Sequence, residues 1–118
     1  MIRRPRRTAA PLDLFYASQK LDQAMSTLDM QIGLRERVVA AYIHYLHRIG
    51  DRTPPVSVAP AFERVFGILR TVAHFPSPEV ARDGTIKATL GKLPDSQLED
   101  LERAIRDLAT IVERERRA

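Results

Sequence analysis

The sequence contains no cysteine. This absence excludes disulfide bonds, thiolate nucleophiles and every cysteine-based zinc or iron–sulfur site. No apolar run approaches the roughly 18 residues that span a bilayer, so we expect no membrane-spanning segment. The five glycines form neither a GxGxxG nor a GxxxxGKS/T loop, and no serine lies in a GxSxG turn. We therefore predict a protein that is not an enzyme and that uses no cofactor.

The three histidines do not form a recognisable metal site. His44 and His47 are three residues apart, a spacing at which two imidazoles on a helix can share a metal ion. The run YIHYLHRIG nevertheless lacks the HExxH pattern and any nearby carboxylate. At 100° per residue, Arg37 projects about 20° and Arg48 about 40° from His44, and their charge disfavours a bound cation. We predict no metal site and assign the histidines to a polar helix face.

The 118 residues suffice for one domain with its own hydrophobic core. Hydrophobic residues make up 44% and charged residues 29% of the chain, which is typical of a globular protein. The first eleven residues, MIRRPRRTAAP, differ because they carry four arginines, two prolines and little apolar surface. We predict a flexible basic arm over 1–11 and a single helical domain over 12–118. Because no apolar signal segment follows the arginines, we expect a cytoplasmic protein.

Positive charge is concentrated in two parts of the sequence. The net charge is +4, and residues 1–7 alone contribute +4. Residues 30–92 contribute another +4, whereas residues 8–29 and 93–118 contribute −2 each. Sixteen of the nineteen basic residues are arginine, whose planar guanidinium can bind a phosphate through two hydrogen bonds. Arginine-favouring codons in a GC-rich genome explain the same enrichment, so the distribution of charge is more informative than the arginine count.

The apolar periodicity predicts an all-α fold, a small bundle of four or five helices. Asp13 is a good N-cap for a first helix, and the pattern breaks near residues 30–33. A second helix is expected over about 34–49, where Gly50 occupies the position of a C-terminal cap. An eleven-residue loop with three prolines follows this helix.

The second half of the chain is expected to add at least two more helices. Pro60 suits the first turn of a third helix, which should end before Pro76. Residues 79–90 fit either short helices broken near the Asp-Gly pair or a short β-hairpin around that pair, and we favour helices. A last helix should begin near Ser96, whose spacing to Glu99 fits a capping box.

The last helix carries a regular apolar stripe. Together with neighbouring apolar residues the stripe covers about 160° of the helix, more than a minimal bundle needs. We predict that the surplus binds a second copy of the chain and makes the protein a homo-oligomer. The alternative is that all stripes meet inside one compact monomer. The candidate oligomerisation residues lie at heptad spacing: Leu98, Leu101, Ile105, Leu108 and Val112.

Basic side chains on the arm, on the polar faces of the second and third helices and in the loop between these helices form a candidate nucleic-acid-binding surface. If the two helix faces adjoin, their guanidinium groups can neutralise phosphates and release counterions. The arm can enter a minor groove or follow a phosphate backbone. The alternative is a solvated charged face that Glu63 partly neutralises. The candidates are Arg3, Arg4, Arg6, Arg7, Arg37, His44, Arg48, Arg52, Arg64 and Arg70.

A helix-turn-helix motif cannot be placed, because the third helix follows a long proline-rich loop instead of a turn of three or four residues. We therefore expect contact mainly with the phosphate backbone. Our prediction is a non-enzymatic, oligomeric DNA-associated protein that does not bind membranes. In size and charge it is comparable to regulators and DNA-loading subunits such as phage packaging components. The rival prediction is a protein–protein adaptor or inhibitor that uses its apolar helix faces and binds no nucleic acid.

Overall fold

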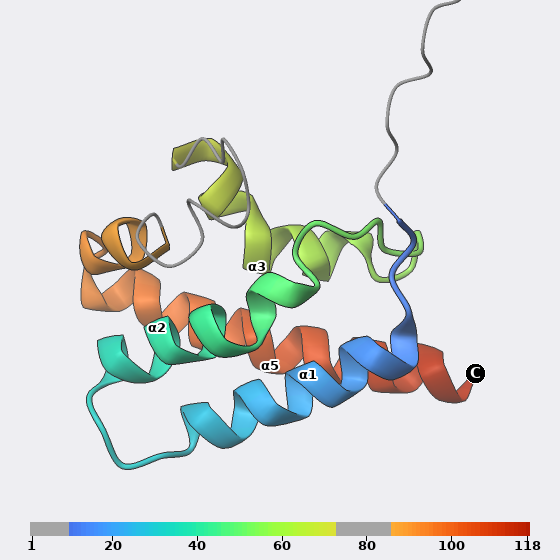
Figure 1. Ribbon diagram of the computed structural model, residues 1–118, viewed down its shortest axis with the longest axis horizontal. Coiled ribbons are helices and arrows are strands. Elements are labelled where there is room, and N and C mark those ends of the chain that lie inside the picture. The colour runs from blue at the N-terminus through green and yellow to red at the C-terminus, as the bar shows by residue number, and fades with distance from the viewer. Residues whose placement is uncertain (1–9, 73–85) are drawn as a thin grey trace, which may run out of the picture.

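The computed structural model describes residues 10–72 and 86–118, without the side chains of residues 70–72. Its elements are α1 (Leu14–Leu28), α2 (Leu34–His44), the 3₁₀ helix η1 (Leu46–Arg48), α3 (Ala59–Val72) and α5 (Asp95–Arg117), with a further helical stretch at residues 86–91. The predicted all-α bundle is therefore confirmed (Figure 1). Within these residues the only extended pairing is an isolated parallel bridge between Pro11 and Thr53.

α5 is the central helix of the bundle, and α1, α2 and α3 all pack against it. α1 and α5 lie side by side and run in opposite directions (Figure 1). Two hydrogen bonds fix this register, one from Ser18 to Glu113 and one from Arg106 to Asp29. As a result, the start of α1 and the end of α5 lie at one end of the molecule, and the loop between α1 and α2 lies at the other.

The apolar stripe of α5 is buried inside this single chain. All five residues to which we assigned self-association lie in one core cluster with buried side chains of α1, α2 and α3. The stripe is wide because three neighbouring helices cover it, and it leaves no face for a second copy. This burial corrects our assignment of the oligomerisation residues, which lie in the core of the folded chain: Leu98, Leu101, Ile105, Leu108 and Val112.

Local sequence signals predict the first residue of α1 correctly, but not that of α5. α1 begins where predicted, with the Asp13 carboxylate accepting hydrogen bonds from the backbone N–H groups two and three residues later. α5 begins earlier than a capping box allows, because Asp95 is already helical and Pro94 occupies the cap position. No side chain caps α5, so the predicted Ser96–Glu99 capping box is wrong.

α2 is shorter than the predicted helix over 34–49. The α-helix ends at His44, and the chain continues through η1 to Ile49, which is fully buried. The buried Tyr42 side chain anchors this end of α2, since its hydroxyl donates a 2.6 Å hydrogen bond to the carbonyl of Val65 in α3. The change to a tighter helix therefore occurs where α2 is bonded to another helix.

Gly50 follows the last helical turn, as predicted, and its N–H donates a 3.1 Å hydrogen bond to the carbonyl of Leu46. It also allows close packing against α3. No glycine in the described ranges has a positive φ. A Cβ atom at Gly50 would lie 2.9 Å from Cδ1 of Phe66, which is closer than real Cβ contacts. The absence of a side chain therefore lets the segment after η1 approach α3.

The helical conformation of residues 86–91 decides between the two interpretations of residues 79–90. The second strand of the alternative hairpin would occupy the residues that are helical, so the hairpin is not formed. The predicted break near Gly84 and the predicted end of the third helix before Pro76 lie outside the described residues.

Candidate nucleic-acid interface

Arg37 is bound inside the bundle and is not part of an open basic face. Its guanidinium donates a 2.8 Å hydrogen bond to the carbonyl of Ile32 and forms a 3.3 Å ion pair with Glu102 of α5. Only 21% of the Arg37 side chain is exposed. Glu102 also lies 3.6 Å from Arg106, which in turn is 2.8 Å from Asp29. These contacts give Arg37 a role in joining α2 to α5.

Arg64 of α3 is likewise paired with α5, at 3.3 Å from Asp107. Glu102 and Asp107 are five residues apart on α5, which places them about 140° apart around the helix at 100° per residue. The carboxylate partners of Arg37 and Arg64 therefore lie on different flanks of α5. Arg37 of the predicted α2 face and Arg64 of the predicted α3 face therefore do not lie side by side, because each pairs with a different flank of α5.

Arg48 and Arg52 keep exposed positions after the end of α2. No carboxylate in the described ranges forms an ion pair with Arg48, and His44 is exposed on the preceding turn with its ring 6.1 Å from that of Tyr45. Arg52 lies 3.7 Å from the neighbouring Asp51, and both side chains are well exposed. Such an exposed pair contributes little to stability. These two arginines remain available for contact with a ligand, whereas the Arg70 side chain lies outside the described residues.

The base of the arm is hydrogen-bonded to Thr53, the residue after Arg52. The N–H of Leu12 donates a 2.8 Å hydrogen bond to the carbonyl of Thr53, and the N–H of Thr53 donates a 2.9 Å hydrogen bond to the carbonyl of Ala10. Ala10 and Pro11, which we had assigned to the arm, are thus bonded to the folded body. Arg7 is three residues from Ala10, so at most about 10 Å of extended chain separates them.

The arm arginines Arg3, Arg4, Arg6 and Arg7 lie outside the described residues, but the sequence shows how much of the charge they hold. Residues 10–72 and 86–118 contain fourteen basic and thirteen acidic side chains. The folded body is therefore almost neutral, and the arm supplies nearly all of the net positive charge.

The end of α5 adds basic side chains that our sequence analysis missed. Residues 93–118 have a net charge of −2, and none of their arginines is among our candidates, yet the structure places the last turn of α5 beside the start of α1 (Figure 1). The guanidinium carbon of Arg116 lies 5.7 Å from the centre of the Phe15 ring. Arg114 is exposed, and the described part of the chain provides it with no carboxylate partner. Charge summed along one helix does not reveal which turn lies near the arm.

Glu113 is the anionic centre of this last turn. Hydrogen bonds from Arg116, then from Ser18 and Arg117, lower the pKa of its carboxyl group to about 2. The Ser18 hydroxyl lies 2.7 Å from the carboxylate and the Arg117 Nε lies 3.0 Å from it. Glu113 therefore ties the end of α5 to α1 and neutralises part of the basic turn.

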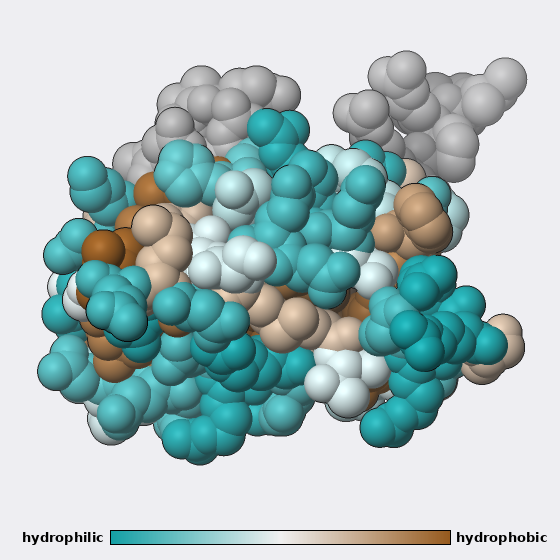
Figure 2. Space-filling view, turned by 90° about the horizontal axis from the view of Figure 1, so that it is seen from below, coloured by the Kyte–Doolittle hydropathy of each residue, from teal (hydrophilic) through white to brown (hydrophobic). Residues whose placement is uncertain are grey.

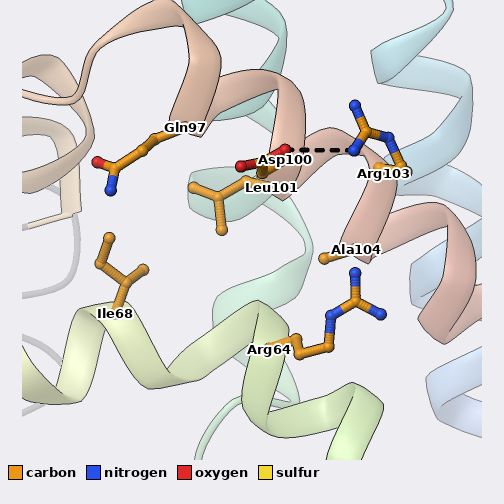
Figure 3. A pocket seen from close by; sticks show the side chains of 7 residues that line it. All are labelled: Arg64, Ile68, Gln97, Asp100, Leu101, Arg103 and Ala104. Carbon is orange, nitrogen blue, oxygen red and sulfur yellow. Dashed lines mark hydrogen bonds and ion pairs between the residues drawn. The ribbon is translucent and has the colours of Figure 1, made fainter.

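A groove of about 340 Å³ between α3 and α5 lies away from the arm. Ile68 and Leu101 form its apolar wall, and Arg103 donates a 3.2 Å hydrogen bond to Asp100 at its edge (Figure 3). The groove contains no histidine, serine or threonine, so we assign no reaction to it. Its lining residues are Arg64, Ile68, Gln97, Asp100, Leu101, Arg103 and Ala104.

Over residues 10–72 and 86–118, no three histidine or acidic side chains are grouped so that they could hold a metal ion. Among the same residues, no helix has both the length and the apolar character that crossing a membrane requires. The chain matches no protein-family model, no curated protein and no solved structure.

Proposed function

We propose that this protein binds duplex DNA through the phosphate backbone and that the arm, Arg48 and Arg52 make the contacts. In this role it is a non-enzymatic DNA-associated subunit, of the kind that serves in regulation or in the loading of DNA. Its basic site, defined here as Arg3, Arg4, Arg6, Arg7, Arg48 and Arg52, is smaller than the surface that the sequence suggested. Arg37 and Arg64 are left out because α5 carboxylates neutralise them.

The observation that carries this proposal is the fastening of the arm to Thr53. An unattached basic tail would only attract phosphates, whereas two backbone hydrogen bonds join the base of this one, at Ala10 and Leu12, to Thr53, the residue after Arg52. A phosphate strand that meets the arm is thereby directed to the segment from Arg48 to Thr53. Because the rest of the described body is nearly neutral in net charge, it adds little long-range attraction for the strand.

The proposal predicts a defined dependence of affinity on salt. Six arginines that each neutralise one phosphate give a slope of log K against log salt of about −5, or about a thousandfold loss between roughly 50 and 200 mM salt. The measurement is fluorescence anisotropy of a labelled duplex of random sequence, repeated over that range of salt. Replacing the four arm arginines by glutamine should bring the slope to about −2.

A matched pair of double variants tests the folded part of the site. Arg48→Gln with Arg52→Gln should reduce the slope by about 2. Arg64→Gln with Arg103→Gln removes the same charge at the groove between α3 and α5 and should leave the slope unchanged. If the wild-type protein does not bind duplex at low salt, the proposed function is wrong. If both double variants reduce the slope equally, the contact is diffuse and the assignment to Arg48 and Arg52 is wrong.

One observation favours the rival function of a protein–protein adaptor. Met30 and Ile32, in the loop between α1 and α2, are 53% and 37% exposed. Figure 2 shows apolar atoms at the end of the molecule that carries this loop. A partner protein held there would stay bound at high salt, because apolar contact is not screened by ions. Binding that survives high salt and is lost in Ile32→Ser would support the adaptor function and not the DNA-binding one.

A further inference from the structure

The loop between Thr53 and Val58 presents an apolar side chain next to the base of the arm. Val56 is 91% exposed, the highest exposure among the large apolar residues of the described chain. Single exposed apolar residues are common on protein surfaces. The position and the stiffness of this loop distinguish Val56 from Met30 and Ile32, which lie at the far end of the bundle.

Both ends of the loop are fixed. At one end Thr53 is hydrogen-bonded to Ala10 and Leu12. At the other end Val58 is fully buried in the core, and its N–H donates a 2.9 Å hydrogen bond to the carbonyl of Pro55. This bond closes a tight turn with Val56 at its tip. Pro54 and Pro55 restrict the backbone further, since the proline ring fixes φ near −65°.

The surroundings of Val56 suit a phosphate backbone. Ser57, which follows it, is exposed and offers a hydroxyl group. The first turn of α3 begins three residues after Val56 and contains no acidic residue, so no carboxylate there opposes a nearby phosphate. Arg52 lies on the other side of the loop, one residue before Thr53. Val56 is thus an apolar tip between a basic arm and groups that can bind phosphate.

Proteins that bend DNA from the minor groove combine basic arms with an apolar side chain that wedges between two base pairs. We propose that Val56 is such a wedge and that this protein bends the duplex it binds. The inference rests on the proposed function, because a wedge can act only on DNA that the arm has already bound. Its ligand is duplex DNA with an easily unstacked step, such as a mismatch or a nick, where insertion of the side chain costs less.

The test uses the full chain and a duplex labelled at both ends with a fluorescent donor and acceptor. Wild-type protein should bring the ends together, as expected for a bend of about 20–90°. It should also bind a duplex with a central mismatch about tenfold more tightly than an intact one. Val56→Ser should abolish the bend and the preference for the mismatch, while the salt slope of the remaining binding stays unchanged. Met30→Ser, a matched loss of an exposed apolar side chain at the other end, should behave as wild type.

Each other outcome overturns the inference in a recognisable way. If Val56→Ser bends DNA as wild type does, the wedge is wrong and the proposed function stands. If the wild-type protein binds with the expected salt slope but leaves the duplex straight, the inference is again wrong by itself. If the wild-type protein does not bind DNA at low salt, both proposals fail. If Val56→Ser instead disrupts an association between copies, measured by light scattering, the loop is a protein contact and not a wedge.

Discussion

Arg37 and Arg48 are expected to have different roles. Arg37 stabilises the fold, whereas Arg48 contacts DNA in the proposed function. Replacing either by alanine removes one positive charge from the same region of the sequence. Arg37 is four-fifths buried and paired with Glu102, whereas Arg48 is exposed and has no ion-pair partner in the described ranges. We expect Arg37→Ala to change stability and Arg48→Ala to change DNA binding.

The size of the Arg37 effect follows from its two contacts. A hydrogen bond to a charged group contributes about 1.5–3 kcal/mol when buried, and an exposed ion pair contributes about 0.2–1 kcal/mol. The Arg37 side chain lies between these limits, and Arg106 remains near Glu102 to neutralise it after the substitution. We therefore expect a loss of about 1–2 kcal/mol in the free energy of unfolding, which lowers the Tm by about 5–10 °C in a domain of this size.

Thermal unfolding followed by circular dichroism and DNA anisotropy over a range of salt measure the two effects separately. Arg48→Ala should leave the Tm within about 2 °C of wild type, because exposed side chains without partners contribute little to stability. It should reduce the salt slope of DNA binding by about 1, the value for one lost phosphate contact. Arg37→Ala should leave that slope unchanged. The reverse pattern, with a changed slope for Arg37→Ala alone, would refute the division of the basic residues given above.

Three further predictions concern the fold. Tyr42→Phe removes a buried hydrogen bond to α3 and keeps the ring, so we expect a loss of about 1 kcal/mol in chemical denaturation. Gly50→Ala places a methyl group against Phe66 and should cost about 1–3 kcal/mol in the same assay, whereas Gly91→Ala, at a site with free space, should not. The pKa of Glu113 is lower in the folded chain, so its contribution to stability is fully present above the ordinary carboxyl pKa of about 4.5 and is lost as the pH falls toward about 2. Glu113→Gln should remove this part of the acid dependence of unfolding, and an unchanged acid dependence would contradict it.

The parts of the fold that the sequence predicted correctly depend on neighbours in the chain. Asp13 caps α1 through backbone groups two and three residues away. The periodic apolar stripe of α5 predicts the helix itself, but not that α1, α2 and α3 bury the stripe that we assigned to self-association. The parts that differed depend on distant residues. α2 is bonded to α3 at Tyr42, and Gly50 is small because Phe66 approaches it. A periodic pattern cannot report a partner that lies sixteen or more residues away.

The same difference between local and distant residues explains which parts of the basic site could be predicted from the sequence. The arm is visible as four arginines in seven residues, so its charge could be predicted from sequence alone. The partners of Arg37 and Arg64 lie 65 and 43 residues further along the chain, and neither pairing has a local signal. Without the fold, all arginines on polar helix faces appear equivalent. The fold divides them into residues that pair with carboxylates of α5, such as Arg37 and Arg64, and residues that do not, such as Arg48 and Arg52.

In the proposed function, the attachment of the base of the arm at Thr53 gives the nearly neutral body a role in DNA binding. Charge on the arm determines how strongly a polyanion is attracted, but a free tail would leave the orientation of the ligand undefined. Two backbone hydrogen bonds place the base of the arm between Arg52 and the rigid turn that carries Val56. A strand held by the arm is then positioned relative to the helices without any basic face on the bundle. The ion pairs that Arg37 and Arg64 form with α5 carboxylates are therefore compatible with the proposed DNA binding, because that proposal places the contact where the arm begins.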